Sequence, residues 1–250
     1  GDLARVVGHL GLIEWVLASG WLAIGGAALA VLRRHLRRET GAMPWLWLLV
    51  GVITLMTQLA SALAFGGTLM QAILMAVPHR GWVFSSPYDA VRMAACGTQL
   101  QLWMGAWPVG LGLAWLVWTR RAAEALAVVF SAWVGSLALG ALGLLWVRSL
   151  VALWDGTTPF VGGVQVAEAV VMACGSLGVA GSLLGNGAVV AWSSWRTAAV
   201  FSVLVPGTTL LLAGLITPPD VVSQVLAGLL MMACWSVGAL FGAAAAWWQR

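Results

Sequence analysis

Long apolar segments separated by short polar turns dominate the chain. A helix needs about 20 mostly apolar residues to cross a bilayer. Segments that meet this requirement lie at approximately 7–32, 44–77, 91–118, 122–154, 164–192, 198–216 and 221–248. The pattern therefore predicts an all-α, polytopic membrane protein of about seven transmembrane helices. The first residues show no short apolar run followed by a small-residue cleavage site, so no signal peptide is expected.

Composition supports the same interpretation. Hydrophobic residues make up 62% of the chain and charged residues only 8%, against about 25% charged residues in a typical soluble domain. So few charges cannot cover a soluble surface, and the lipid bilayer is the expected surrounding. The net charge of +4 does not predict a nucleic-acid partner, because the arginines cluster at the ends of apolar segments.

The distribution of arginines predicts the orientation. With seven spans, one side of the membrane would carry Arg33, Arg34, Arg37, Arg38, Arg120, Arg121, Arg196 and Arg250. The opposite side would carry or lie near Arg5, Arg80, Arg92 and Arg148. Positive charge accumulates on the cytoplasmic side, so we expect the N-terminus outside and the C-terminus inside. Tryptophans near the same segment ends, such as Trp47, Trp118 and Trp192, fit the membrane interface.

An internal repeat is indicated by two similar turns. Ser86-Pro87-Tyr88-Asp89 precedes the third segment and Thr217-Pro218-Pro219-Asp220 precedes the seventh, each with an aspartate suited to capping a helix. At the same offset Gly97 matches Gly228. In the preceding segments, Gly67-Thr68 corresponds to Gly207-Thr208. We therefore expect a first three-helix repeat over 1–121, a linker helix over 122–155 and a second, parallel three-helix repeat over 156–250.

The three-helix unit resembles the membrane core of the MotA/TolQ/ExbB proton-channel family. The resemblance rests on Gly66-Gly67-Thr68-Leu69-Met70-Gln71, on Ala95-Cys96-Gly97 through Gly105-Ala106-Trp107-Pro108, and on the matching second copy. It implies a degenerate, duplicated relative that serves in a membrane complex. Two departures bear on proton conduction: the link at 33–43 replaces a large cytoplasmic region, and the third segment has Gln99 and Gln101 where the family can carry a carboxylate.

Polar residues within the apolar segments are the candidate functional groups. A polar path is expected on the second and third segments, with the spacing of the first four placing them on one helix face: Thr54, Thr57, Gln58, Ser61, Thr68, Gln71, Gln99 and Gln101. The alternative is simple interhelical hydrogen bonding. Glu14 and Glu168 are candidate intramembrane carboxylates that either accept ions or pair with Arg5, Arg92 or Arg148.

Small residues predict where helices approach one another closely. Gly178, Gly181, Ser182 and Gly185 form small-xxx-small steps in the fifth segment, and we expect them to make a helix-packing face. The chain offers no expected catalytic residue, cofactor site or metal site, because acids, bases and metal ligands are scarce and dispersed.

These observations favour a non-catalytic integral membrane subunit of a multi-subunit complex. We expect it in the bacterial inner membrane, associated with other membrane subunits or with copies of itself through glycine-rich helix faces. It would be ion-channel-like or a scaffold. The alternative is a small-molecule or lipid transporter built on parallel repeats, with a polar cavity between the halves. A membrane enzyme acting on lipids is the least favoured class.

Overall fold

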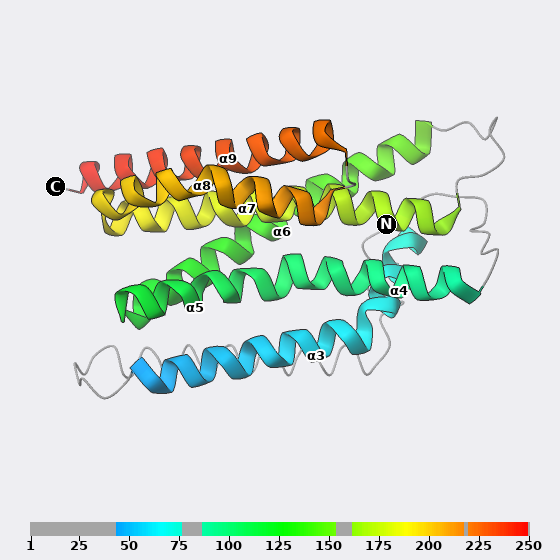
Figure 1. Ribbon diagram of the computed structural model, residues 1–250, viewed down its shortest axis with the longest axis horizontal. Helices are drawn as coiled ribbons and strands as arrows, with labels where there is room; N and C mark the ends of the chain where they lie inside the picture. The colour runs from blue at the N-terminus through cyan, green and yellow to red at the C-terminus, as the bar shows by residue number, and fades with distance from the viewer. Residues whose placement is uncertain (1–43, 77–86, 154–161, 218–219, 250) are drawn as a thin grey trace.

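The computed structural model describes residues 44–76, 87–153, 162–217 and 220–249, and the regular elements over these ranges are helical. They form six helical spans long and apolar enough to cross a membrane (Figure 1). The elements are α3 (Pro44–Ala76), α4 (Pro87–Gln101), the π-helical segment η1 (Leu102–Ala106), α5 (Trp107–Thr119), α6 (Ala122–Leu153), α7 (Gly163–Ser193), α8 (Trp195–Ile216) and α9 (Val221–Trp248). The segments α4, η1 and α5 run on as a single span.

The prediction of an all-α protein with several membrane-spanning helices is confirmed over the described ranges. The first predicted segment, 7–32, lies outside the described residues, so the structure supports six of the expected spans. Successive spans alternate in direction, which puts Arg120, Arg121 and Arg196 at one end and Arg92 and Arg148 near the other (Figure 1). Which end faces the cytosol stays a prediction.

Helix α7 is the centre of the bundle. Buried residues account for 78% of its most apolar stretch, against 6% for α3. Its neighbours include α6 and α9, and the backbones come into direct contact with α7 at several glycines. A Cβ at Gly181 would lie 2.0 Å from the Gly135 carbonyl oxygen of α6, and one at Gly187 would lie 2.4 Å from the Trp235 carbonyl oxygen of α9. Only glycine permits backbones to come this close.

The third span contains a local change of helix geometry that the sequence analysis did not predict. The Trp107 N–H donates to the carbonyl of Leu102, five residues earlier, in a π-helical turn. Pro108 follows directly; it has no N–H, and its ring would collide with the carbonyl four residues before it. Widening the helix over 102–106 accommodates the proline. Such π-helical turns occur frequently at functional positions.

Helix α3 is attached to the rest of the bundle mainly by a crossing with α4. A Cβ at Gly97 would lie 1.6 Å from the Gly66 carbonyl oxygen, so the two backbones touch. Beside this contact the Thr98 hydroxyl donates to the Ala62 carbonyl at 3.0 Å. In Figure 1, α3 lies at the edge of the described helices, next to α4 and α5. One side of α3 therefore faces the remainder of the bundle and the other is exposed.

The predicted repeat stays a prediction. Where the first copy has the Gly66–Gly97 crossing, the match of Gly67-Thr68 with Gly207-Thr208 puts Pro206 in the place of Gly66 and Gly228 in the place of Gly97. A Cβ at Gly228 would meet the side chain of Leu210 rather than a backbone. The two helix pairs thus differ at the contact that the sequence match singles out.

We expect Gly181→Ala to destabilise the fold by about 1–3 kcal/mol, because the added methyl group overlaps the backbone of Gly135, which cannot rotate away. Gly207→Ala is the matched control, since it makes the same change in open space within α8. It should leave stability unchanged or raise it by up to about 1 kcal/mol. Thermal and denaturant unfolding in one detergent measure both; equal effects would contradict the packing described here.

The N-terminus of α9 should be sensitive to acid. Asp220 accepts a hydrogen bond from the Ser223 N–H at 2.7 Å, and this bond holds the pKa of Asp220 below its ordinary value of 3.8. A carboxylate whose pKa is lowered by folding stabilises the folded state above its unfolded pKa and loses that contribution as the pH falls through the folded value. Asp220→Asn keeps a capping oxygen that does not titrate.

We therefore predict that unfolding between pH 5 and pH 2 depends less on pH in Asp220→Asn than in the parent chain. Ser194→Asn is a suitable control, because Ser194 caps α8 through the Thr197 N–H and does not titrate in this range. Circular dichroism during pH titration is the measurement. Identical pH profiles for the parent and Asp220→Asn would show that the cap carries no pH dependence.

Candidate functional site

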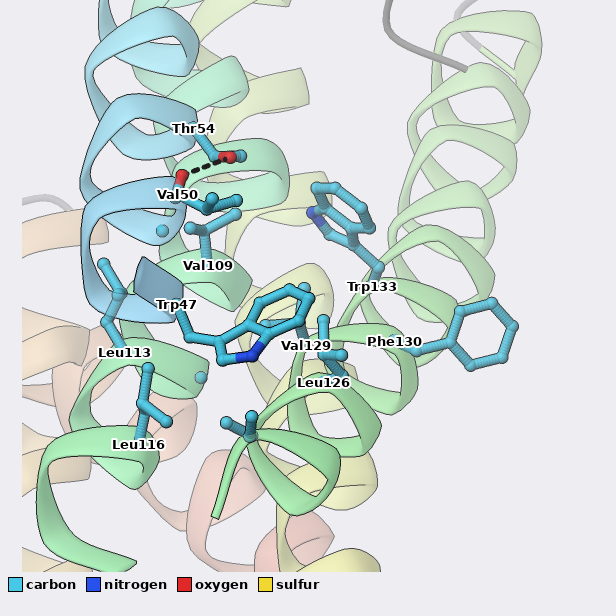
Figure 2. A pocket seen from close by; sticks show the side chains of 14 residues that line it. Trp47, Val50, Thr54, Val109, Leu113, Leu116, Leu126, Val129, Phe130 and Trp133 are labelled. Carbon is cyan, nitrogen blue, oxygen red and sulfur yellow. Dashed lines mark hydrogen bonds between the residues drawn. The ribbon is translucent and has the colours of Figure 1, made fainter. Parts of the chain in front are cut away.

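The concave feature that the structure offers as a candidate site is an apolar groove between α3, α5 and α6. Its volume is about 180 Å³. Three aromatic residues from two helices, Trp47, Phe130 and Trp133, contribute to its walls. Figure 2 shows the Trp47 indole reaching from α3 toward Val129 and Leu126. The Thr54 hydroxyl lies in this lining but is already bonded to the Val50 carbonyl at 2.8 Å.

Two glycines allow the three helices of the groove to pack together. A Cβ at Gly51 of α3 would lie 2.2 Å from a methyl carbon of Leu113, and one at Gly112 of α5 would lie 2.1 Å from a methyl carbon of Val129. Each glycine therefore leaves room for a branched side chain from the neighbouring helix. The groove exists because these three helices meet at their backbones yet leave space beside Trp47.

Towards the middle of the span, the groove ends near η1. The Trp133 indole N–H donates to the Gly105 carbonyl at 3.0 Å, which ties α6 to the π-helical segment. A Cβ at Gly105 would lie 2.9 Å from Gln58 Oε1, so the Gln58 side chain of α3 abuts the same place. Trp107 of α5 also donates to Ser182 Oγ at 2.9 Å, which fixes α5 against α7.

The other end of the groove adjoins the turn from α5 to α6. Leu116 and Ala122 line the groove, and Arg120 and Arg121 lie between them in the chain. Arg120 adopts the left-handed conformation with φ 57° and is exposed. Arg121 forms an ion pair with Glu124 at 2.8 Å. This pairing raises the pKa of the Arg121 guanidinium through its hydrogen bond to the carboxylate.

The residues expected to form a polar path differ in their exposure. Thr54 lines the groove, whereas Thr57, Thr68 and Gln71 are exposed. The remaining four members are partly buried: Gln58, Ser61, Gln99 and Gln101. Thr57 lies about 100° around the helix from its neighbour Gln58. Because Gln58 abuts Gly105, Thr57 is turned to the outside.

The threonine hydroxyls of this set are bonded within their own helix. The Thr57 hydroxyl donates to the Ile53 carbonyl at 2.7 Å, and the Thr68 hydroxyl donates to the Phe65 carbonyl at 2.8 Å. Such local bonds satisfy a hydroxyl group without any partner helix. These hydroxyls therefore bond within α3, and both the polar path and its interhelical alternative stay predictions.

Of the two candidate carboxylates, Glu14 lies outside the described residues. Glu168 of α7 forms an ion pair with Arg92 of α4, and both side chains are partly exposed, at 41% and 46%. Arg92 is one of the pairing partners that the sequence analysis proposed. The pair links two helices near one end of the bundle, so the Glu168 carboxylate is engaged by a cation of the same chain.

The small residues of α7 meet other helices of the same chain. Besides Gly181, a Cβ at Gly185 would lie 2.3 Å from the Ser131 carbonyl oxygen, and one at Gly178 would lie 3.1 Å from Ser136 Oγ. Ser182 is fully buried, donates to the Val179 carbonyl at 2.7 Å and accepts from Trp107. Lateral association through this face, as the sequence analysis expected, would need the space that α6 and α5 already occupy.

Apart from Thr54, sequence reasoning missed the groove residues. Trp47 carried a signal only for the membrane interface, and Phe130 and Trp133 carried none. Gly51 and Gly112 were the available signal, because each interrupts a run of large apolar residues in the half of its span near the arginine-rich end. Their meaning depends on which helices are neighbours, and that information is not in the local pattern.

Comparison of the chain with models of protein families, with curated proteins and with solved structures finds no match. The resemblance to the MotA/TolQ/ExbB family therefore stays a prediction from the residues that carry it.

Trp133→Phe should destabilise the groove by about 1 kcal/mol, because it removes the donor to the Gly105 carbonyl and leaves that oxygen without this bond. Trp146→Phe is the matched control, since Trp146 lies on the same helix with 59% of its surface exposed. Its effect should stay within about 0.5 kcal/mol. Denaturant unfolding followed by circular dichroism measures the difference; equal stabilities of the two variants would refute the role given to this hydrogen bond.

Proposed function

We propose that the chain is a non-catalytic integral membrane subunit that assembles side by side with other transmembrane helices. The partner is another subunit of a membrane complex or a second copy of this chain. The docking surface is the outer face of α3, defined here by Ala60, Ala64, Thr68 and Gln71. The proposal extends to the bacterial inner membrane, with Arg120, Arg121 and Arg196 on the cytosolic side as the positive-inside rule predicts.

The observation that carries the proposal is an exposed ladder of small residues on a loosely attached helix. Ala60, Ala64 and Thr68 recur every four residues, and all three are exposed. Residues at this spacing share one helix face. The Thr68 hydroxyl is folded back onto the Phe65 carbonyl, which leaves a compact surface. Small-xxx-small faces allow close approach of helices in lipid, where packing rather than the hydrophobic effect drives association.

A comparable small-residue face on α7 packs against another helix of the same chain. On α7 the steps between Gly181 and Gly185 receive the backbone of α6 at Gly135 and Ser131. The α3 ladder repeats the spacing with alanine and threonine, which permit a slightly wider approach. Buried residues account for only 6% of the most apolar stretch of α3, and the residues of its outer face are exposed.

Gln71 adds a polar group to this surface. It lies within one turn of Thr68 on the same side of α3 and is exposed. A side-chain amide facing hydrocarbon gains from a hydrogen-bond partner on an adjacent helix, by roughly 0.6 to 2 kcal/mol. A partner helix with a polar side chain at this depth would supply it. The ladder thus provides close packing and Gln71 provides specificity.

Within this proposal scaffolding is favoured over ion conduction. Thr57 and Thr68 hydroxyls are bonded to their own helix, and Glu168 is paired with Arg92. Ion conduction would need polar groups that converge on one path. A channel-like role, related to the family that the sequence resembles, would then require the partner subunit to contribute part of the path.

The transporter alternative is less supported by the geometry. It expects a polar cavity at the middle of the membrane between two halves of the chain. The groove described above is apolar and lies among α3, α5 and α6. Among its lining residues, only Thr54 and the indoles of Trp47 and Trp133 carry side-chain groups that can form hydrogen bonds.

The test is site-directed cross-linking in native membranes. The background is a chain in which Cys96, Cys174 and Cys234 are replaced by alanine. In this background Ala64→Cys should form a cross-linked species with a helix of a partner or of a second copy. Ala60→Leu in that background should reduce the product at least fivefold, because a large side chain separates the helices. Ala141→Cys and Ala138→Leu on exposed α6 positions are the matched controls. Equal cross-linking from Ala64 and Ala141, or none from either, would rule out docking at α3.

A further inference from the structure

The groove between α3, α5 and α6 has the depth of one leaflet. Along α6 it runs from Ala122 to Trp133, a rise of about 16 Å at 1.5 Å per residue. The hydrocarbon core of a bilayer is about 30 Å thick. The length of the groove, measured from the α5–α6 turn, therefore matches about half of the core thickness. Near the middle it stops where Gln58 and Trp133 meet Gly105.

This length distinguishes between possible occupants. A transmembrane helix crosses the whole core, so it would need a groove about twice as long. An acyl chain of a phospholipid occupies one leaflet and can end where the groove ends. The lining is also suited to a flexible hydrocarbon chain, because it is made of branched aliphatic and aromatic side chains such as Leu113, Leu126 and Phe130. The geometry favours lipid over a helix.

The open end of the groove is positively charged. Arg120 and Arg121 lie in the turn between Leu116 and Ala122, both lining residues. Glu124 pairs with Arg121 and also accepts a hydrogen bond from the Trp115 indole at 3.3 Å. Arg120 is exposed, and the ion pairs of the described residues do not involve it. Its guanidinium leaves the turn with a net positive charge at the level of lipid headgroups.

We propose that this groove is a binding site for an anionic phospholipid. One acyl chain lies between Trp47, Leu113 and Leu126, and the phosphate contacts the Arg120 guanidinium at the end of the groove. Arg121 contributes to the field but is shared with Glu124. On α3 the site uses Trp47, Val50, Gly51 and Thr54, none of which belongs to the outer face proposed for assembly, so each proposal can fail without the other.

Native mass spectrometry of the purified full chain tests the proposal. The chain in detergent micelles is titrated with phosphatidylglycerol and, separately, with phosphatidylcholine of the same acyl composition. One phosphatidylglycerol should bind more tightly than further copies and more tightly than phosphatidylcholine. Equal affinity for the two lipids, or binding without a first tight site, would overturn the proposal.

Two variants and a control locate the site. Arg120→Asn should weaken the first binding step about fivefold, the expected share of one interfacial arginine; asparagine tolerates the left-handed backbone at this position. Ala122→Phe should weaken it further by filling the mouth of the groove. Arg196→Gln removes a charge from the same end of the bundle, outside the groove, and should leave the step unchanged. Equal losses for Arg120→Asn and Arg196→Gln would mean general surface attraction and would refute the site.

Photo-cross-linking gives an answer independent of variant folding. Phosphatidylglycerol with a diazirine in the middle of one acyl chain should label peptides that contain Leu113, Leu126 or Phe130 in the unmodified chain. Labelling spread evenly over α8 and α9, which also expose large apolar side chains, would contradict the proposal.

Discussion

The contact on which the bundle depends is the direct approach of helix backbones at glycine. In a bilayer, apolar side chains gain little by leaving lipid for protein, so helices associate through close packing. Helix α7 meets this requirement on two sides, with Gly181 against Gly135 of α6 and Gly187 against Trp235 of α9. The consequence is a central helix in which buried residues make up 78% of the most apolar stretch, against 28% in α6 and 39% in α9.

The position of the third span follows from this centre and from Pro108. The proline widens the helix into a π-helical turn, and the polar groups around that turn are used as ties between helices. Trp107 donates to Ser182 of α7 and Trp133 donates to Gly105 of η1. In a medium without water these indole hydrogen bonds fix the rotation of α5 relative to α6 and α7. That rotation leaves the groove open on the side of α3.

Helix α3 is the exception in the bundle, and both proposals concern it for that reason. Its backbone touches α4 at Gly66 and Gly97, while its outer face carries an exposed ladder of small residues. Nearer its N-terminus the same helix forms one wall of a groove about half as long as the hydrocarbon core of a bilayer is thick. A weakly attached helix has surface available for a neighbour, and the two faces of α3 differ in what they can accept: close backbone packing outside, and a flexible chain inside.

Hydrophobic pattern alone determined that the chain is helical and apolar enough to cross a membrane several times, and where the described helices begin and end to within a few residues. This worked because the length of an apolar run and the position of a proline or an aspartate are local properties, as at Pro87 and Asp220. Only the tertiary structure decided which helices are neighbours: that Gly181 meets Gly135, that Glu168 pairs with Arg92, and that Trp47 and Trp133 border a groove. The outer surface and the helix contacts of a membrane protein are both made of apolar or small residues, so composition does not separate them. The rotation of each helix about its axis, which is set by packing at the glycines, decides which residues face another helix and which face outward.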